Sequence, residues 1–192
     1  MKSNRNQPDI DAILNGNAQE FSKLVEEYKN IVFTVGLRML KNTEEAEEVA
    51  QDTFVKVYKS LNNFKRDSKL STWIYRIAYN TCLDRIKKNK KEMYNVSMDE
   101  IDGFEITQMN NALEQLITEE KSMLVKKCVA QLSAKDAALI SFFYFEEKNL
   151  NELSEILSLT ENNVKVGLFR ARKRLAVILK EQLNAEIIGN YG

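Results

Sequence analysis

The sequence predicts an all-α protein made of two small helical domains that an acidic linker joins. A chain of 192 residues is long enough for one ordinary domain or for two small ones. One proline and six glycines leave few breaks between elements, which favours helices over a strand-rich fold. A hydrophobic content of 44% is enough to build a core, so most of the chain is expected to fold.

The composition excludes several classes of site. The chain has no histidine, which rules out Ser-His-Asp and Cys-His catalysis and any zinc site that uses imidazole. Its two cysteines, Cys82 and Cys128, are too few for a four-thiolate site, and we expect both to be small buried residues of a reducing, cytoplasmic protein. We therefore predict no catalytic residue, no metal and no cofactor. No apolar run is long enough to span a membrane, and the N-terminus lacks an apolar signal core.

Charge is balanced overall but strongly separated along the chain. Residues 65–91 carry nine basic and two acidic side chains, and residues 160–180 carry six basic and one acidic. Between them, residues 92–120 carry eight acidic side chains and no lysine or arginine. Two basic blocks around an acidic stretch suggest two polyanion-facing modules, although solvated helix faces with clustered charge remain an alternative.

The middle of the chain has no sustained apolar period. Residues 92–117 are rich in acidic side chains and asparagine, so we interpret them as a linker at a domain boundary. The predicted domains are residues 8–91 and residues 118–181.

Apolar spacing predicts a helix over residues 21–40 and a second one that ends near Leu61. Asn42, followed by Glu45, resembles a capping box and opens the second helix. Its buried side is expected to hold Ala46, Val49, Ala50, Thr53, Phe54, Val57 and Leu61. Its opposite side is expected to hold Glu45, Glu48, Asp52, Val55, Lys56 and Lys59. That acidic row containing Val55 is either a docking face or ordinary solvated surface.

A polar, basic loop over residues 62–71 precedes a helix that runs to about Lys90. This helix has two apolar stripes and a remaining strip of Trp73, Arg76, Asn80, Asp84 and Lys87. A tryptophan with cations and an amide in one exposed row suits stacked bases and phosphates. The alternative for Trp73 alone is an ordinary core residue.

The C-terminal part predicts helices over residues 118–131, from the Ser133 cap through Phe145, over residues 151–157, and a long helix that Thr160 caps. The buried stripe of the long helix is Val164, Leu168, Ala171, Leu175 and Ile178. Its outer face presents Asn163, Val166, Gly167, Arg170, Lys173 and Arg174. The last two helices predict a helix-turn-helix for a DNA major groove, with a plain helical hairpin as the alternative.

Three stretches in order resemble bacterial RNA polymerase sigma factors of the extracytoplasmic-function class. Residues 44–54 are similar to the core-binding helix of that family. Residues 71–80, continued by Leu83-Asp84-Arg85, are similar to its promoter-melting and minus-ten segment. Residues 164–175 are similar to its minus-thirty-five recognition helix. The resemblance extends from about Asp9 to Lys180.

The resemblance implies a role for each of these surfaces. Docking on core RNA polymerase is implied for Glu48, Gln51, Asp52 and Val55. Contact with the opened minus-ten DNA is implied for Asn62, Phe64, Lys65, Lys69, Trp73, Arg76, Asn80, Asp84 and Lys87. Contact with the minus-thirty-five duplex is implied for Asn163, Lys165, Val166, Arg170, Lys173 and Arg174. The linker is implied to thread through the polymerase near the template strand.

The sequence departs from the family pattern at three positions. The family commonly has a basic residue where this chain has Gly167 and a small polar residue where it has Val166. Ser158 stands at the turn position that glycine usually occupies, so it must adopt a strained backbone if that turn is left-handed.

We therefore expect a dissociable, cytoplasmic sigma factor that is not inserted in a membrane. Its expected partners are core RNA polymerase, promoter DNA and an anti-sigma factor. A transcriptional regulator that uses the helix-turn-helix alone is the alternative, but it leaves the first half of the chain unexplained. A helical adaptor leaves both basic blocks unexplained, and an enzyme lacks any nucleophile-base pair, phosphate loop or metal cluster.

Overall fold

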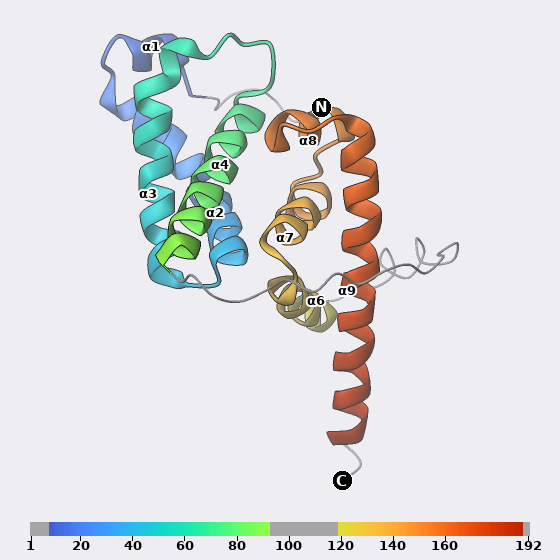
Figure 1. Ribbon diagram of the computed structural model, residues 1–192. Coiled ribbons are helices and arrows are strands. Elements are labelled where there is room, and N and C mark those ends of the chain that lie inside the picture. The colour runs from blue at the N-terminus through green and yellow to red at the C-terminus, as the bar shows by residue number, and fades with distance from the viewer. Residues whose placement is uncertain (1–7, 93–118, 190–192) are drawn as a thin grey trace.

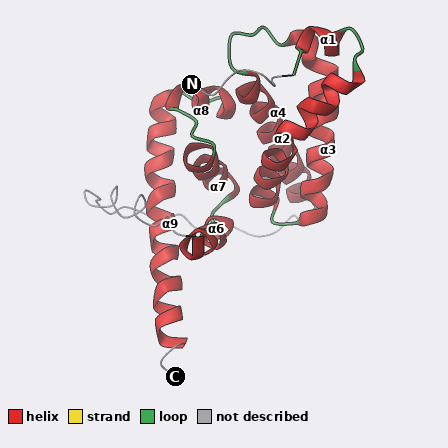
Figure 2. Ribbon diagram, turned by 180° about the vertical axis from the view of Figure 1, so that it is seen from behind, coloured by secondary structure: helices red, strands yellow, loops and turns green. Residues whose placement is uncertain are grey.

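The computed structural model describes residues 8–92 and 119–189, which form helices and short loops without a strand (Figures 1 and 2). In chain order the elements are α1 (Ile10–Leu14), α2 (Ala18–Leu40), α3 (Thr43–Ser60), the 3-10 helix η1 (Leu61–Asn63), α4 (Leu70–Glu92), α6 (Glu119–Gln131), α7 (Ala134–Ile140), the π-helical turn η2 (Ser141–Phe145), α8 (Leu150–Leu157) and α9 (Glu161–Gly189). The all-α prediction is confirmed. Apart from Glu92, which ends α4, the predicted linker lies outside the described residues.

Polar caps define where the N-terminal helices begin. The Asn17 side chain accepts from the backbone amides of Gln19 and Glu20 at the start of α2. The Asn42 side chain accepts from the Glu45 amide at 2.9 Å at the start of α3, as predicted. The Glu45 carboxylate accepts from Asn89 Nδ2 at 2.6 Å, so it ties α3 to α4. The sequence analysis missed α1, whose five residues are too few to show a period.

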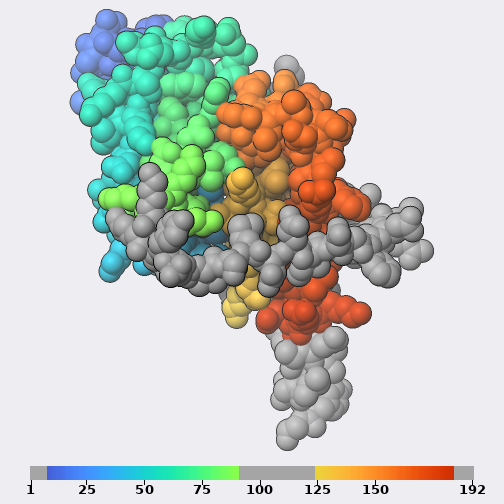
Figure 3. Space-filling model, in the orientation of Figure 1, coloured from blue at the N-terminus to red at the C-terminus, as the bar shows by residue number. Residues whose placement is uncertain are grey.

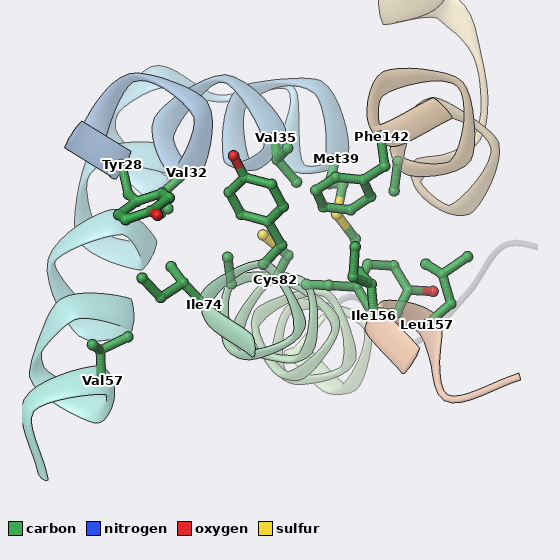
Figure 4. Close-up of a cluster of buried hydrophobic side chains, with 14 of the residues drawn as sticks. Tyr28, Val32, Val35, Met39, Val57, Ile74, Cys82, Phe142, Ile156 and Leu157 are labelled. Carbon is green, nitrogen blue, oxygen red and sulfur yellow. The ribbon is translucent and has the colours of Figure 1, made fainter. Parts of the chain in front are cut away.

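Helices α2, α3 and α4 pack together and bury the predicted apolar sides. Leu24 and Val35 of α2, Val57 of α3, and Ile74 and Cys82 of α4 are almost completely buried in one cluster (Figure 4). Removing each large side chain from water contributes about 1.5–3 kcal/mol. Cys82 is buried as predicted, and burial raises the pKa of its thiol to about 12.

The C-terminal helices have a smaller core of their own. Helices α6, α7 and α9 surround Cys128, Leu132, Ile140, Leu175 and Leu179. The last of these helices extends past its neighbours at the C-terminal end in both ribbon views, beyond the predicted domain end at residue 181.

The helix predicted from the Ser133 cap to Phe145 changes its geometry before it ends. The α-helical part stops at Ile140, and the next five residues form the π-helical turn η2. Within it, the Glu146 amide donates to the Ser141 carbonyl at 3.2 Å, five residues back. The wider turn leaves Phe142 fully buried while Tyr144 and Phe145 are exposed. A π-helical turn holds one residue more than an α-helical turn. Sequence periodicity cannot detect this residue, because it rotates the apolar face of the helix over only a single turn.

The two halves of the molecule share one core. The cluster that contains α2, α3 and α4 also contains Phe142, Leu153, Ile156 and Leu157 from the C-terminal half. Figure 4 shows Phe142, Ile156 and Leu157 next to Met39 and Cys82, and Figure 3 shows the surfaces of α4 and α8 in contact. Helix α4 packs on α8, and α2 packs on α7.

Polar contacts surround this shared core. The Tyr75 ring stacks on Phe142 with 5.4 Å between centroids, and its hydroxyl donates to Glu146 Oε2 at 3.0 Å. Lys148 Nζ donates to Ser71 Oγ at 3.2 Å. Two further contacts join the halves, Lys69 to Glu152 at 2.8 Å and Arg38 Nη1 to Ser141 Oγ at 2.7 Å.

Glu152 is the most buried carboxylate of this contact, with a side chain that is 11% exposed. Burial acts to raise its pKa, but the Lys69 hydrogen bond, the Asn149 amide and the Lys148 charge outweigh burial, so the pKa of Glu152 lies below its ordinary value of 4.5. A carboxylate with a lowered pKa in the folded state stabilises the fold above its ordinary pKa. That stabilisation disappears as the pH falls through the lowered value.

We expect Glu152→Gln to destabilise the protein by an amount that depends on pH. Glutamine keeps the capping-box acceptor for the Asn149 amide but removes the charge that faces Lys69. The difference in unfolding free energy between wild type and variant should be constant above about pH 4.5 and shrink as the pH falls further. Urea denaturation of both proteins from pH 7 to pH 3 measures it. A difference that stays the same over the whole range would show that the ion pair does not stabilise the fold.

Candidate nucleic-acid interface

The acidic row of α3 faces solvent. Glu48, Gln51, Asp52 and Val55 are all exposed, and Val55 leaves 50% of its surface accessible. The opposite side of the helix is buried against α2 and α4 through residues such as Val49 and Val57. The row therefore presents one exposed apolar side chain among carboxylates.

An arginine of α4 lies beside this acidic row. Arg85 Nη1 is 2.6 Å from Glu48 Oε2, and Arg85 Nη2 is 3.8 Å from Asp52 Oδ2. The hydrogen bond that Arg85 donates to the Glu48 carboxylate raises the pKa of Arg85. The carboxylates keep 63% and 59% of their side-chain surface exposed, so a partner can still reach them. This contact could not be predicted from the sequence, because Arg85 and Glu48 lie 37 residues apart in the chain.

The loop between η1 and α4 brings two aromatic rings together. Phe64 and Trp73 lie 5.2 Å apart between centroids with an interplanar angle of 43°. Both are half-buried, and Asn62, Lys65 and Lys69 around them are exposed. In the same loop Arg66 has a left-handed backbone with φ of 61° and forms an ion pair with Asp11 of α1. Helix α1 therefore helps to fix the loop, which the sequence analysis could not predict without detecting α1.

The predicted strip on α4 is present. Arg76, Asn80, Asp84 and Lys87 are exposed along one side of the helix, below Trp73 in its first turn. Trp73 packs against the core with part of its surface and is half-buried. The strip offers one ring, cations, an amide and a single carboxylate to a ligand.

Lys69, another of the predicted minus-ten residues, forms an ion pair with the other half of the chain. Its Nζ lies 2.8 Å from Glu152 Oε1, while 71% of its side chain remains exposed. The lysine stands in the loop before α4, and Glu152 belongs to α8 in the other half of the chain.

Helices α8 and α9 form the predicted helix-turn-helix. Ser158 ends α8 in the left-handed conformation, with φ of 54° and ψ of 45°, so it accepts the strain that the sequence analysis anticipated. The Leu159 amide donates to the Ser154 carbonyl at 3.0 Å across the turn. The Asn163 amide donates to Thr160 Oγ1 at 3.2 Å, which confirms Thr160 as the cap of α9.

The outer face of α9 is narrower than predicted. Asn163, Lys165, Val166 and Arg170 are exposed, whereas Lys173 is half-buried. Gly167, which was placed on the outer face, lies against α7 instead, because a Cβ there would be 3.0 Å from Leu139 Cδ1.

Arg174 is tied to α7, although 55% of its side chain stays exposed. Its Nη1 donates to Asp136 Oδ2 at 2.8 Å, and the Asp136 side chain is only 9% exposed. Periodicity identified the exposed side of Arg174 but not the buried carboxylate that it neutralises.

A shallow hollow of about 210 Å³ lies where α9 approaches the N-terminal half. Tyr79, Leu139, Leu157 and Gly167 form its apolar part, and Arg170 and Arg174 line it as well. Arg170 therefore stands between this hollow and the exposed face of α9.

The described residues hold no cluster of three or more cysteine and acidic side chains that a metal ion would require. Among the helices in the described part of the chain, none is sufficiently long and apolar to cross a membrane.

Two family models match the two halves of the chain. Residues 24–92 match sigma-70 region 2, and residues 122–175 match sigma-70 region 4. The first match covers α3, α4 and the loop between them, and the second covers the helix-turn-helix.

Curated proteins show the same relationship along nearly the whole chain. The ECF RNA polymerase sigma factor SigW of Bacillus subtilis is 31% identical over 181 residues, which cover 90% of this chain and 95% of SigW. The ECF RNA polymerase sigma factor SigM of the same species is 28% identical over 164 residues, which cover 85% of this chain and 98% of SigM.

Two solved structures share the fold. The sigma factor RpoE of Bartonella quintana, crystallised with the anti-sigma factor NepR, superposes with a TM-score of 0.63 at 20% identity, over 84% of this chain and 98% of RpoE. CnrH, in complex with the cytosolic domain of CnrY, superposes with a TM-score of 0.60 at 20% identity, over 90% of this chain and 95% of CnrH.

Sigma factors are transcription initiation factors and not enzymes, which agrees with the prediction from composition. With both sigma-70 regions in order and a relative above 30% identity along its length, the chain belongs to the ECF family of RNA polymerase sigma factors.

Proposed function

We propose that this sigma factor divides promoter recognition among three exposed faces. The row Glu48, Gln51, Asp52 and Val55 docks on core RNA polymerase, and the Phe64–Trp73 pair with the α4 strip holds the opened minus-ten DNA. The exposed side of α9 reads the minus-thirty-five duplex. The observation that carries the proposal is that all three faces are exposed on one chain of this family.

The same division supports the domain boundaries predicted from charge. Residues 8–91 would be the docking and melting domain, residues 92–117 the linker, and residues 118–181 the duplex-reading domain. A regulator that uses the helix-turn-helix alone would leave the exposed α3 row and the α4 strip without a role.

The α4 strip suits unpaired bases better than a duplex. The half-buried Trp73 ring is braced by Phe64, so it is held in place before DNA arrives. Stacking on an aromatic ring contributes about 1–3 kcal/mol per base and needs a base that has left its own stack. Arg76, Asn80 and Lys87 are placed to bind the backbone and base edges beside it.

The exposed residues of α9 suit base edges in a major groove. Asparagine pairs well with adenine, arginine with guanine, and an apolar side chain with the thymine methyl group. Asn163, Val166 and Arg170 supply one residue of each kind within two turns. Lys165 and Lys173 would contact phosphates and set the salt dependence of binding.

An anti-sigma factor is the third proposed partner. The solved RpoE structure contains one, and this chain shares that fold. We also place this protein in the cytoplasm, where core polymerase and promoter DNA are found.

We expect the pair Glu48→Gln and Asp52→Asn to weaken binding to core polymerase at least tenfold, or by about 1.4 kcal/mol. Both carboxylates are exposed on a helix whose other side forms the core, so the fold should survive. Titration of labelled sigma factor with core polymerase measures the effect.

Two controls accompany this pair. Glu47→Gln removes a charge from the same exposed turn, outside the proposed docking row, and should bind normally. Arg85→Gln breaks the internal ion pairs but leaves both acids, and it should also retain binding. If Arg85→Gln loses as much affinity as the acidic pair, the acids act through Arg85 and not through the polymerase.

We expect Trp73→Ala and Asn80→Ala to impair strand opening, and Arg170→Ala to impair duplex reading. Loss of Arg170 should cost about 1–3 kcal/mol of holoenzyme binding if it contacts a base edge. Each mutant holoenzyme is compared on ordinary promoter duplex and on a promoter that is already unpaired around the minus-ten element. Pre-opening should partly rescue the Trp73 and Asn80 variants and leave the Arg170 defect unchanged. Rescue of Arg170→Ala would mean that α9 does not read duplex DNA.

A further inference from the structure

Helix α1 lies outside the matched sigma-70 region 2, which begins at residue 24, yet it is anchored to the N-terminal half. Its Ile13 side chain is only 3% exposed and belongs to the core. The Asp9 carboxylate caps the helix by accepting from the Ala12 amide at 3.1 Å. The Asp9 amide in turn donates to Glu20 Oε2 of α2 at 3.1 Å, so α1 is fixed in position beside η1, on which it also packs (Figure 1).

The loop between η1 and α4 has one side-chain tie to the rest of the molecule in its middle. Among loop residues 65–68, Arg66 is the one whose side chain forms a hydrogen bond or an ion pair within the described part of the chain, and its partner is Asp11 of α1. Neither side chain is buried, since Asp11 keeps 68% of its side-chain surface exposed and Arg66 keeps 55%. The attraction between the two charges, rather than packing, therefore ties the loop to α1.

The backbone of Arg66 needs such a tie. Its φ of 61° lies in the left-handed region, which is unfavourable for a residue that carries a Cβ. Such a conformation persists only where surrounding contacts hold it. The ion pair with Asp11 supplies that contact, so its loss would let the loop leave this conformation.

This loop carries one ring of the proposed minus-ten site. Phe64, two residues before Arg66, lies 5.2 Å from Trp73 between ring centroids, and both rings are half-buried. If the loop changed its conformation, Phe64 would no longer brace the Trp73 ring. DNA would then have to order both rings as it binds, and this ordering lowers affinity.

We infer that Asp11 is a positioning residue for the minus-ten site. Through its ion pair with Arg66 it holds the loop in the conformation that keeps Phe64 on Trp73, so that the Trp73 ring is fixed before an unpaired base arrives. Asp11 acts through Arg66 and needs no contact with DNA. The positioning stands on the ion pair and on the backbone of Arg66, whereas its effect on DNA rests on the proposed role of Trp73.

Positioning is tested without DNA, because Trp73 is the only tryptophan of the chain and its fluorescence reports on the Phe64–Trp73 pair. Asp11→Asn removes the charge but keeps the shape of the side chain, and it should make Trp73 more accessible to quenching by acrylamide, a neutral quencher. The matched control, Glu26→Gln, removes an acid from the exposed Lys29–Glu26 ion pair of α2 and should be quenched like wild type.

A double-mutant cycle identifies the partner through which Asp11 acts. Arg66→Gln should raise the quenching of Trp73 as Asp11→Asn does, and the double variant should be quenched no more than either single variant. Unchanged quenching in Asp11→Asn, or a double variant whose effect is the sum of the two, would overturn the positioning.

The effect on DNA is measured with holoenzyme on the promoter that is already unpaired around the minus-ten element, at a salt concentration that screens exposed charges. Asp11→Asn should bind this DNA severalfold more weakly than wild type, whereas simple loss of a negative charge would strengthen binding. The deficit should disappear on a probe that lacks the single base whose removal also abolishes the deficit of Trp73→Ala. Normal binding of Asp11→Asn to the intact probe, or an equal deficit on both probes, would overturn the effect on DNA.

Failure of the proposed minus-ten role has a different signature. In that case Trp73→Ala itself would bind the intact, unpaired promoter as wild type does, while the quenching of Trp73, which involves no DNA, would still decide whether Asp11 positions the loop.

Discussion

Helix α4 is the element against which both halves of the molecule pack, and its surface is divided three ways. One side, with Ile74 and Cys82, completes the core of the N-terminal half. A second side, with Tyr75 and Tyr79, faces the C-terminal half through Phe142 and Leu157. Only the third side remains exposed, and it is the one that carries the proposed DNA strip. A side chain on α4 therefore cannot change without affecting one of the two packing surfaces or the strip itself.

Opposite charges form local ion pairs in this chain, whose formal net charge is zero. Arg85 partly neutralises Glu48 and Asp52 on α3, and Arg174 compensates the buried carboxylate of Asp136. These pairs differ in strength because the α3 acids keep most of their surface in water, whereas Asp136 is almost closed off. Because the ion pairs of Arg85 with Glu48 and Asp52 are exposed, breaking them would cost little free energy. The α7–α9 pair is better suited to fixing the helix-turn-helix than to meeting DNA.

The sequence was sufficient to predict what depends on periodicity and caps. Helices α2, α3 and α9 have long apolar stripes, and Asn42 caps α3 and Thr160 caps α9 as predicted. The contacts of Arg85, Lys69 and Arg174 could not be predicted, because each joins residues that are far apart in the chain. Helix α1 is too short to show an apolar period. The π-helical turn η2 adds one residue to a single turn, which is too short a stretch for periodicity to reveal. The roles implied by the family resemblance are a separate matter, since no contact inside the protein assigns a side chain to polymerase or to DNA.

Packing of Gly167 against α7 limits which side of α9 can contact a ligand. A Cβ at this position would lie 3.0 Å from Leu139 Cδ1, and because Leu139 is itself buried, its side chain would have to shift to make room. A long side chain at this position would leave the backbone toward α7. Helix α9 packs closely on α7 at this point, whereas Asn163, Val166 and Arg170, the residues proposed to read bases, are exposed. With only one long cation among those three, the proposed discrimination by α9 would depend more on shape and methyl contacts than on charge. Helix α9 therefore contributes one side to the core and leaves the other side for the proposed DNA contact.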